Sequence, residues 1–268
     1  MSVRFRAPAT TANLGPGFDV AGAALDLWNE LQLTEGTGGG EGHLSVRAFS
    51  VFASPASWSF AFTDRIPRER GLGSSAAVVA LGLVAGAYTA GVEPSIDELL
   101  AAGLELEGHA DNLAPALAGG VCLTWDGHVE RIADDVPAIP IAVIPETRVA
   151  TAESRAALPA SVPRDDAVFT VARAALLGAA LASGDASLFA ASADDRLHET
   201  YRGAAAPHLA ELRADLPDGA LGATLSGSGP TVIVWAERDI SDVLRGRYPQ
   251  HDVAVLPVTA HGASLADG

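Results

Sequence analysis

The chain has 268 residues, of which 49% are hydrophobic and 19% charged, and its formal net charge is −16. The length suffices for one large or two modest domains, and the acidic surplus disfavours binding to the phosphates of DNA or RNA, so we expect no nucleic-acid partner. All 17 basic residues are arginine, which excludes the phosphate-loop lysine of Walker-type nucleotidases and the strand lysine of protein kinases.

The first quarter of the chain predicts two strands separated by turns. Residues 3–7 alternate as a strand does, whereas residues 10–19 form a polar, glycine-rich turn. Residues 36–42 are rich in glycine and predict a flexible break. Residues 58–62 alternate again and place Trp58, Phe60 and Phe62 on one face of a second strand.

Several features favour a cytoplasmic protein with no membrane partner. The N-terminus lacks the apolar core of a signal peptide, and no stretch of about 18 apolar residues runs without polar breaks. The single cysteine, Cys122, excludes internal disulfides and lies in an apolar run, which predicts a buried and unreactive thiol.

Residues 67–77 form the most informative segment. Gly71, Gly73, Ser74 and Ser75 precede an apolar run, a pattern typical of a tight loop that leads into a buried helix over residues 74–90. Such a helix start offers unpaired N–H groups to an anion, glycines allow close approach, and serine hydroxyls can reach a phosphate oxygen or its metal. The alternative is an ordinary capped helix, because serine is a common N-cap.

The rest of the chain mixes helices with short strands. Ser95 with Glu98 predicts a capping box for a helix over residues 96–107. Further helices are expected over 112–117, 166–182, 186–197, 207–216 and 239–245, and strands over 121–125, 139–144, 221–225, 230–236 and 253–258. We therefore predict an α+β fold in two lobes, an N-terminal ATP-binding domain over 1–150 and a C-terminal domain over 151–268.

Five separated motifs resemble the GHMP small-molecule kinases. They cover residues 8–19, 66–77, 107–120, 151–159 and 225–231, and the third and fourth are similar to the homoserine kinase family specifically. The resemblance implies a ribosomal-protein-S5-like N-terminal lobe and a ferredoxin-like C-terminal lobe. It also implies transfer of the γ-phosphoryl of ATP to the side-chain hydroxyl of L-homoserine, which gives O-phospho-L-homoserine for threonine biosynthesis.

The resemblance assigns a nucleotide end to the site. ATP would contact Pro67, Arg70, Gly71, Leu72, Gly73, Ser74, Ser75 and Ala76, and Mg²⁺ would be held by Ser75 and Glu107. Magnesium in kinases usually takes one or two protein oxygens besides phosphates and water, which suits this pair. Without the neighbouring motif, the position of Glu107 at a helix end favours a solvated glutamate over a metal ligand.

The acceptor end needs partners for a zwitterion with a free hydroxyl. Asp19 with Asn13 could accept from the ammonium group, and Arg155 and Arg202 are candidates for the carboxylate, with Arg196 as a competitor. The substrate set also contains His109 and Gly229, and the catalytic set is Asp111, Asn112, Thr151 and Arg155. Asp111 could accept the hydroxyl proton or only orient the hydroxyl, since the family is thought to work without a dedicated base.

Alternatives to homoserine phosphorylation stay open on the sequence alone. The chain could phosphorylate another small hydroxylated acceptor such as L-threonine, or it could bind ligands without turnover. The segment between Asp26 and Ile66 is shorter than is usual in the family, and His43 stands near the position of an asparagine that lies beside adenine there. A homodimer is expected by analogy alone.

Overall fold

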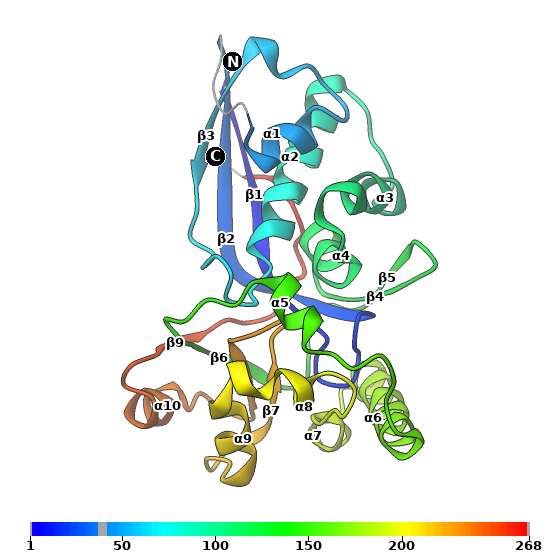
Figure 1. Ribbon diagram of the computed structural model, residues 1–268. Helices are drawn as coiled ribbons and strands as arrows, with labels where there is room; N and C mark the ends of the chain where they lie inside the picture. The colour runs from blue at the N-terminus through cyan, green and yellow to red at the C-terminus, as the bar shows by residue number, and fades with distance from the viewer. Residues whose placement is uncertain (1, 37–41, 267–268) are drawn as a thin grey trace.

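The computed structural model describes residues 2–36 and 42–266, and its helices and strands form two lobes, one above the other in Figure 1. Most of the break predicted over 36–42 lies outside the described residues. The upper lobe is built on an antiparallel sheet of order β10-β1-β2-β4-β5, with β3 also pairing with β2. Its strands are β1 (Ser2–Ala12), β2 (Ala21–Glu35), β3 (Trp58–Thr63), β4 (Val121–Trp125), β5 (His128–Ala133) and β10 (Ser264–Leu265).

Four helices lie together on one side of this sheet (Figure 1). They are α1 (Leu44–Phe49), α2 (Ser74–Ala90), α3 (Ile96–Glu107) and α4 (Ala110–Ala118), and a short 3-10 turn covers Pro55–Ser57. The predicted bounds of α2 and α3 are confirmed, and Ser95 and Glu98 make the predicted capping box. Because α2 is fixed by buried apolar side chains along its length, its N-terminus is held rigidly at the junction of the lobes.

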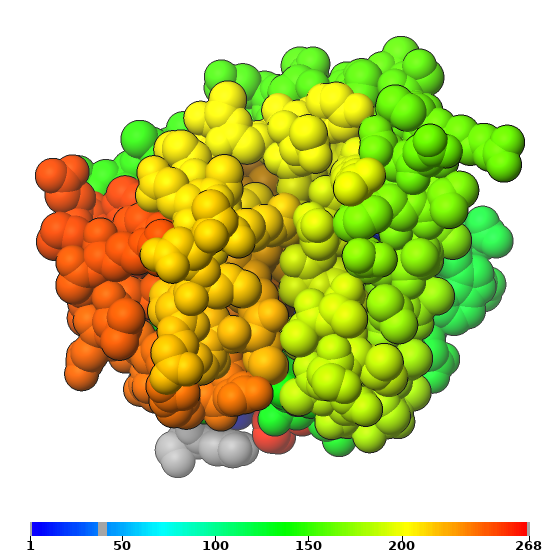
Figure 2. Space-filling model, turned by 90° about the horizontal axis from the view of Figure 1, so that it is seen from below, coloured from blue at the N-terminus to red at the C-terminus, as the bar shows by residue number. Residues whose placement is uncertain are grey.

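The lower lobe is built on a second antiparallel sheet of order β7-β8-β6-β9. Its strands are β6 (Ile139–Ile144), β7 (Ala220–Leu225), β8 (Val232–Ala236) and β9 (Asp252–Val255). Its helices are α6 (Arg164–Ser183), α7 (Ala186–Ser192), α8 (Glu199–Arg202), α9 (Pro207–Ala214) and α10 (Ser241–Arg247), with a 3-10 turn at Gly203–Ala205. Seen from below, these helices cover the face of the lobe that Figure 2 shows. The short helix α5 (Thr151–Ala156) lies where the lobes meet (Figure 1).

One hydrophobic core runs through both lobes. In β8, Ile233 and Trp235 face the cluster that also contains the upper helices, whereas Val232 and Val234 face a smaller cluster with α9 and α10. This alternation is the period of two that a strand buried on both faces must show. The shared cluster fixes the position of one lobe against the other and hence the shape of any site between them.

Neither sheet is built from one side of residue 150 alone. β6 precedes that residue but belongs to the lower sheet, and β10 near the C-terminus returns to pair with β1 in the upper sheet. The division into domains at residue 150 stays a prediction.

Some predicted elements were wrong or missing. The helix expected over 186–197 ends at Ser192, because the Asp195 carboxylate accepts the N–H groups of Leu197, His198 and Glu199 and bends the chain. Residues 10–12 continue β1 rather than forming a turn. The strands β2 and β5 and the helix α5 were not predicted.

The sequence predicts no stretch long and apolar enough to cross a membrane, and α6 departs from this prediction. By length and composition it could cross a membrane, and 22% of its most apolar window is buried. One such helix is weak evidence, because apolar helices of other proteins meet the same criterion. The absence of a membrane partner stays a prediction. Cys122 is fully buried, as expected, and burial raises the pKa of its thiol to about 12.

Candidate active site

Two glycines shape the loop that leads into α2. Gly71 has φ +79° and Gly73 has φ +64°, a region that other residues avoid. A Cβ at Gly71 would lie 2.2 Å from the carbonyl oxygen of Ser226, and one at Gly73 would lie 1.8 Å from Thr10 Oγ1. At these two positions the loop therefore passes too close to its neighbours for a side chain. The loop leads into the first turn of α2, whose unpaired N–H groups face the cavity.

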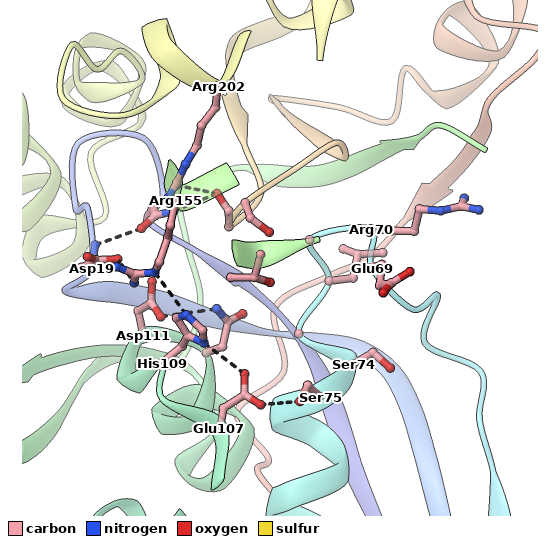
Figure 3. A pocket seen from close by; sticks show the side chains of 18 of the residues that line it. Asp19, Glu69, Arg70, Ser74, Ser75, Glu107, His109, Asp111, Arg155 and Arg202 are labelled. Atoms are coloured by element: carbon pink, nitrogen blue, oxygen red, sulfur yellow. Dashed lines mark hydrogen bonds and ion pairs between the residues drawn. The ribbon is translucent and has the colours of Figure 1, made fainter. Parts of the chain in front are cut away.

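Two oxygen-bearing side chains meet beside this loop. Ser75 in the first turn of α2 donates a hydrogen bond from Oγ to the carboxylate of Glu107, the last residue of α3 (Figure 3). Hydroxyl and carboxylate oxygens are the ligands that Mg²⁺ prefers, and their direct contact means that one cation could touch both. Among residues 2–36 and 42–266, no three His, Cys, Asp or Glu side chains gather as a metal cluster, so this pair would rely on phosphates and water for its other ligands.

His109 joins the glutamate to the opposite side of the cavity. Its Nδ1 lies 3.5 Å from Glu107 Oε1, and its Nε2 accepts a hydrogen bond of 3.2 Å from Arg155 Nε. The hydrogen bond to Glu107 raises the pKa of His109 above its usual value, against the opposing effect of burial. His109 thus lies between Arg155 and the pair of Ser75 and Glu107.

The start of α4 supplies a carboxyl and an amide. Asp111 is 5% exposed, and burial, followed by the nearby charge of Asp19, raises the pKa of its carboxyl. Thr10 Oγ1 donates a 2.8 Å hydrogen bond to Asn112 Oδ1. The amide nitrogen of Asn112 therefore turns toward Asp111, where it lies 3.4 Å from Oδ1.

The loop between β1 and β2 holds Asp19 in place. Asn13 and Asp19 both have positive φ, and the backbone N–H of Asp19 donates to Asn13 Oδ1 at 3.0 Å. The Asn13 amide nitrogen donates to Gly227 O at 3.0 Å. Both ends of the Asn13 amide are thus engaged, and the Asp19 carboxylate is left free to pair with Arg155 Nη2 at 2.9 Å.

Arg202 is a buried cation without a carboxylate. It is 5% exposed, and among the described residues no carboxylate oxygen lies within 4.0 Å of its guanidinium. Its Nη1 donates to Gly227 O at 3.2 Å and to His198 Nδ1 at 3.3 Å, and its Nε has no partner. Burial lowers the pKa of Arg202, as expected for a charge removed from water.

His198 fixes this arginine and the Asp19 loop together. Its Nε2 lies 2.8 Å from Gly15 O, which can only accept, so Nδ1 is the acceptor that faces Arg202. The His198 ring also stacks on the Phe18 ring, with 4.9 Å between the ring centroids, and the Arg202 guanidinium lies over the Phe18 ring as well. By contrast Arg196, the predicted competitor, pairs with Asp166 at 3.3 Å and packs on Phe169.

One cavity brings these groups together, as Figure 3 shows. Of the residues predicted from the sequence, it is lined by Asn13, Asp19, Pro67, Arg70, Gly71, Leu72, Gly73, Ser74, Ser75, Glu107, His109, Asp111, Asn112, Thr151, Arg155 and Arg202. The oxygen pair and the glycine loop lie at one end, and Asp19 and the two arginines lie at the other (Figure 3). The N–H groups at the start of α2 therefore face a region that holds the carboxyl groups of Asp19 and Asp111 and two guanidinium groups.

Comparison with known proteins gives the chain a family. Residues 43–120 match the model of the GHMP kinases N terminal domain, and residues 177–249 match that of the GHMP kinases C terminal. The chain is 40% identical to homoserine kinase from Clavibacter michiganensis over 259 residues, which cover 87% of this chain and 82% of that protein. The chain belongs to the homoserine kinase family.

Further relatives agree with this family. Homoserine kinase from Moorella thermoacetica is 40% identical over 269 residues, 91% of this chain and 88% of that protein. The crystal structure of homoserine kinase from Cytophaga hutchinsonii superposes with a TM-score of 0.87 at 27% identity, covering 99% of this chain and 97% of that one. The predicted GHMP kinase fold is thereby confirmed.

Some predicted residues of this homoserine kinase family member take other places. Ala76 is fully buried and Gly229 packs beside Leu225 and Gly71, so neither lines the cavity. The guanidinium of Arg70 points away from Ser74 and Ser75 (Figure 3) and donates to Pro145 O. Its side chain therefore ties the glycine loop to the lower lobe.

Other lining residues were not selected from the sequence. They are Glu69, Gly227 and Ser228. The last two belong to the turn over 226–229 within the fifth motif, whose Ser226 hydroxyl donates to Gly71 O and lies 2.9 Å from Thr11 Oγ1, so that the turn packs against the glycine loop. Glu69 lies within the motif at 66–77 and the other two within that at 225–231, so the sequence marked both segments.

Proposed function

We propose that the chain transfers the γ-phosphoryl of ATP to the side-chain hydroxyl of L-homoserine and so forms O-phospho-L-homoserine, the precursor used for threonine. The observation that carries the acceptor assignment is Arg202, a buried guanidinium that makes no ion pair within 4.0 Å in the described structure, although the charges of Asp19, Asp111 and Asp195 act on it from farther away. A buried charge is stable only when it is paired, so a substrate carboxylate is the natural partner.

The donor end relies on backbone and hydroxyl groups. Because the chain has no lysine, the triphosphate would rest on the N–H groups at the start of α2 and on the hydroxyls of Ser74 and Ser75. Ser75 and Glu107 would hold Mg²⁺, which supplies charge neutralisation on the phosphate oxygens when bound. Arg70 supports the loop from behind.

The acceptor end matches each charge of the amino acid. Arg202 and Arg155 would receive the carboxylate, and Asp19 the ammonium group. Asn13 acts behind Asp19, since both ends of its amide are already engaged. Thr151 at the start of α5 lines the cavity, and its hydroxyl would orient the acceptor hydroxyl.

Catalysis would come mainly from positioning. Phosphoryl transfer through a loose transition state needs aligned oxygens and charge compensation more than a strong base. Asp111, with Asn112 held beside it by Thr10, would orient the hydroxyl and receive its proton late in the reaction. A homodimer and cytoplasmic residence stay predictions.

An acceptor panel with coupled ADP detection tests this function. L-Homoserine should give the highest kcat/KM, above L-threonine and L-serine, and Arg202→Gln should raise KM for L-homoserine. Preference for L-threonine would favour the alternative acceptor, whereas nucleotide binding without ADP release would favour a silent binding protein.

A further inference from the structure

The two groups proposed to bind opposite ends of the acceptor are paired with each other in the structure. Arg155 Nη2 lies 2.9 Å from Asp19 Oδ1, and Figure 3 shows the two side chains meeting across the acceptor end of the cavity. The carboxylate intended for an ammonium group and the guanidinium intended for a carboxylate thus neutralise each other. Arg202, by contrast, has no carboxylate within 4.0 Å in the described chain.

The surroundings allow this pair to open without rearranging the backbone. Both side chains are about two-fifths exposed, at 42% for Arg155 and 40% for Asp19. Two hydrogen bonds hold α5, the helix that carries Arg155. Just before the helix, Val149 N–H donates to Glu69 O, and within it Ser154 Oγ donates to Ser228 O at 3.1 Å. Rotation of the Arg155 side chain, which also breaks its Nε hydrogen bond to His109 Nε2, would therefore separate it from Asp19 without moving the helix.

We propose that the acceptor binds by exchange of partners, so that Asp19 acts as a latch on Arg155 and makes the site select zwitterions. This rests on the proposed function. The ammonium group replaces Arg155 at Asp19, and the carboxylate, already drawn to Arg202, receives the released Arg155. Before binding, Arg155 and Asp19 pair with each other and Arg202 has no carboxylate within 4.0 Å in the described chain; after binding, each of the three has a partner on the amino acid.

The exchange penalises molecules that carry only one of the two charges. A hydroxy acid without the amino group must break the pair and leave Asp19 unpaired, and an amino alcohol without the carboxylate leaves both arginines unpaired. An exposed ion pair of this kind shifts an equilibrium by up to about fivefold. A hydrogen bond to a charged group shifts one by about ten- to a hundredfold.

Binding of L-homoserine and of its deamino analogue 4-hydroxybutyrate to Asp19→Asn tests the latch. Asparagine tolerates the positive φ of this position, so the fold is kept. Isothermal titration calorimetry in the presence of ADP should show binding of L-homoserine weakened by about ten- to a hundredfold. The same variant should bind 4-hydroxybutyrate about two- to fivefold more tightly than the unaltered chain, because Arg155 is released.

A second variant separates the latch from simple repulsion between Asp19 and an anion. With Arg155→Gln already present, adding Asp19→Asn should bring no gain in 4-hydroxybutyrate binding. The same gain in both backgrounds, or weaker binding in Asp19→Asn, overturns the proposal. Asp218→Asn, which removes an exposed partner of Arg238 outside the cavity, is the matched control and should change neither constant.

Failure of the latch and failure of the proposed function give different results. If the unaltered chain does not phosphorylate L-homoserine, the function is wrong. If it does, and Asp19→Asn fails to favour the deamino analogue, only the partner exchange is wrong.

Discussion

At the scale of single residues, Glu107 is the side chain on which the metal assignment depends. Glu107→Gln keeps the shape but loses the charge, so we expect kcat to fall by on the order of a hundredfold or more, with a higher Mg²⁺ requirement. Steady-state ADP release over a Mg²⁺ series measures both. Glu105→Gln, on an exposed site of the same helix, should leave both unchanged. Equal Mg²⁺ dependence in Glu107→Gln and the unaltered chain would contradict the assignment.

Residues whose role follows from local sequence could be predicted, and those defined by distant contacts could not. Ser75, Glu107 and Asp111 stand beside glycines or caps that mark loops, and the structure brings them into one cavity. Thr10 orients Asn112 across 102 positions, and His198 reaches Gly15 across 183 positions. No spacing along the chain reports such contacts, because the fold alone brings these residues together.

At the scale of elements, the glycine loop ahead of α2 makes the sharpest prediction. Gly73 and Gly91 flank α2 with similar φ values of +64° and +67°, but only Gly73 has neighbours within 4 Å of a Cβ. Gly91→Ala should cost about 1 kcal/mol of unfolding free energy from backbone strain alone. Gly73→Ala should cost more than about 2 kcal/mol and weaken ATP binding as well, because the Cβ displaces Thr10.

Urea unfolding and titration with ATP measure the two effects of these variants separately. Similar losses of stability in Gly73→Ala and Gly91→Ala would show that the contact with Thr10 carries no weight. Normal ATP binding by Gly73→Ala would remove the loop from the nucleotide site.

Elements with a clear period or cap were predicted well, and those without one were missed. The capping box predicted where α3 begins, and the apolar run predicted the extent of α2. β2 begins with five consecutive buried residues rich in alanine, so it shows no alternation there. α5 has no side-chain cap, and it lies where the two lobes meet.

At the scale of the whole molecule, burial in the lower lobe links stability to pH. Burial, followed by the charge of His251, lowers the pKa of His208 to about 4. Below about pH 6.5 the unfolded chain binds a proton that folded His208 resists. Its contribution to stability is therefore full above pH 6.5 and is lost as pH falls toward 4.

Urea unfolding between pH 7 and pH 4 should show this loss as a slope of at most about 1.4 kcal/mol per pH unit from this group. His208→Gln should have a flatter profile, although it is less stable at pH 7. His261→Gln, at an exposed histidine, is the matched control variant. An identical slope in His208→Gln would show that His208 titrates normally in the folded protein.

The two-lobe architecture could be predicted from the motifs, whereas the sheet to which each strand belongs could not. A strand before residue 150 belongs to the lower sheet and the C-terminal strand belongs to the upper one, and one core joins both sheets. This continuity holds the glycine loop and the Asp19–Arg155 pair in one cavity, as the proposed transfer requires.

Phosphorus NMR of a mixture of the protein, ATP, Mg²⁺ and L-homoserine tests the central claim most directly. We predict one new phosphomonoester resonance, that of O-phospho-L-homoserine, growing in equal amount to ADP and absent without L-homoserine. Release of inorganic phosphate in its place, or an unchanged ATP spectrum, would contradict the account.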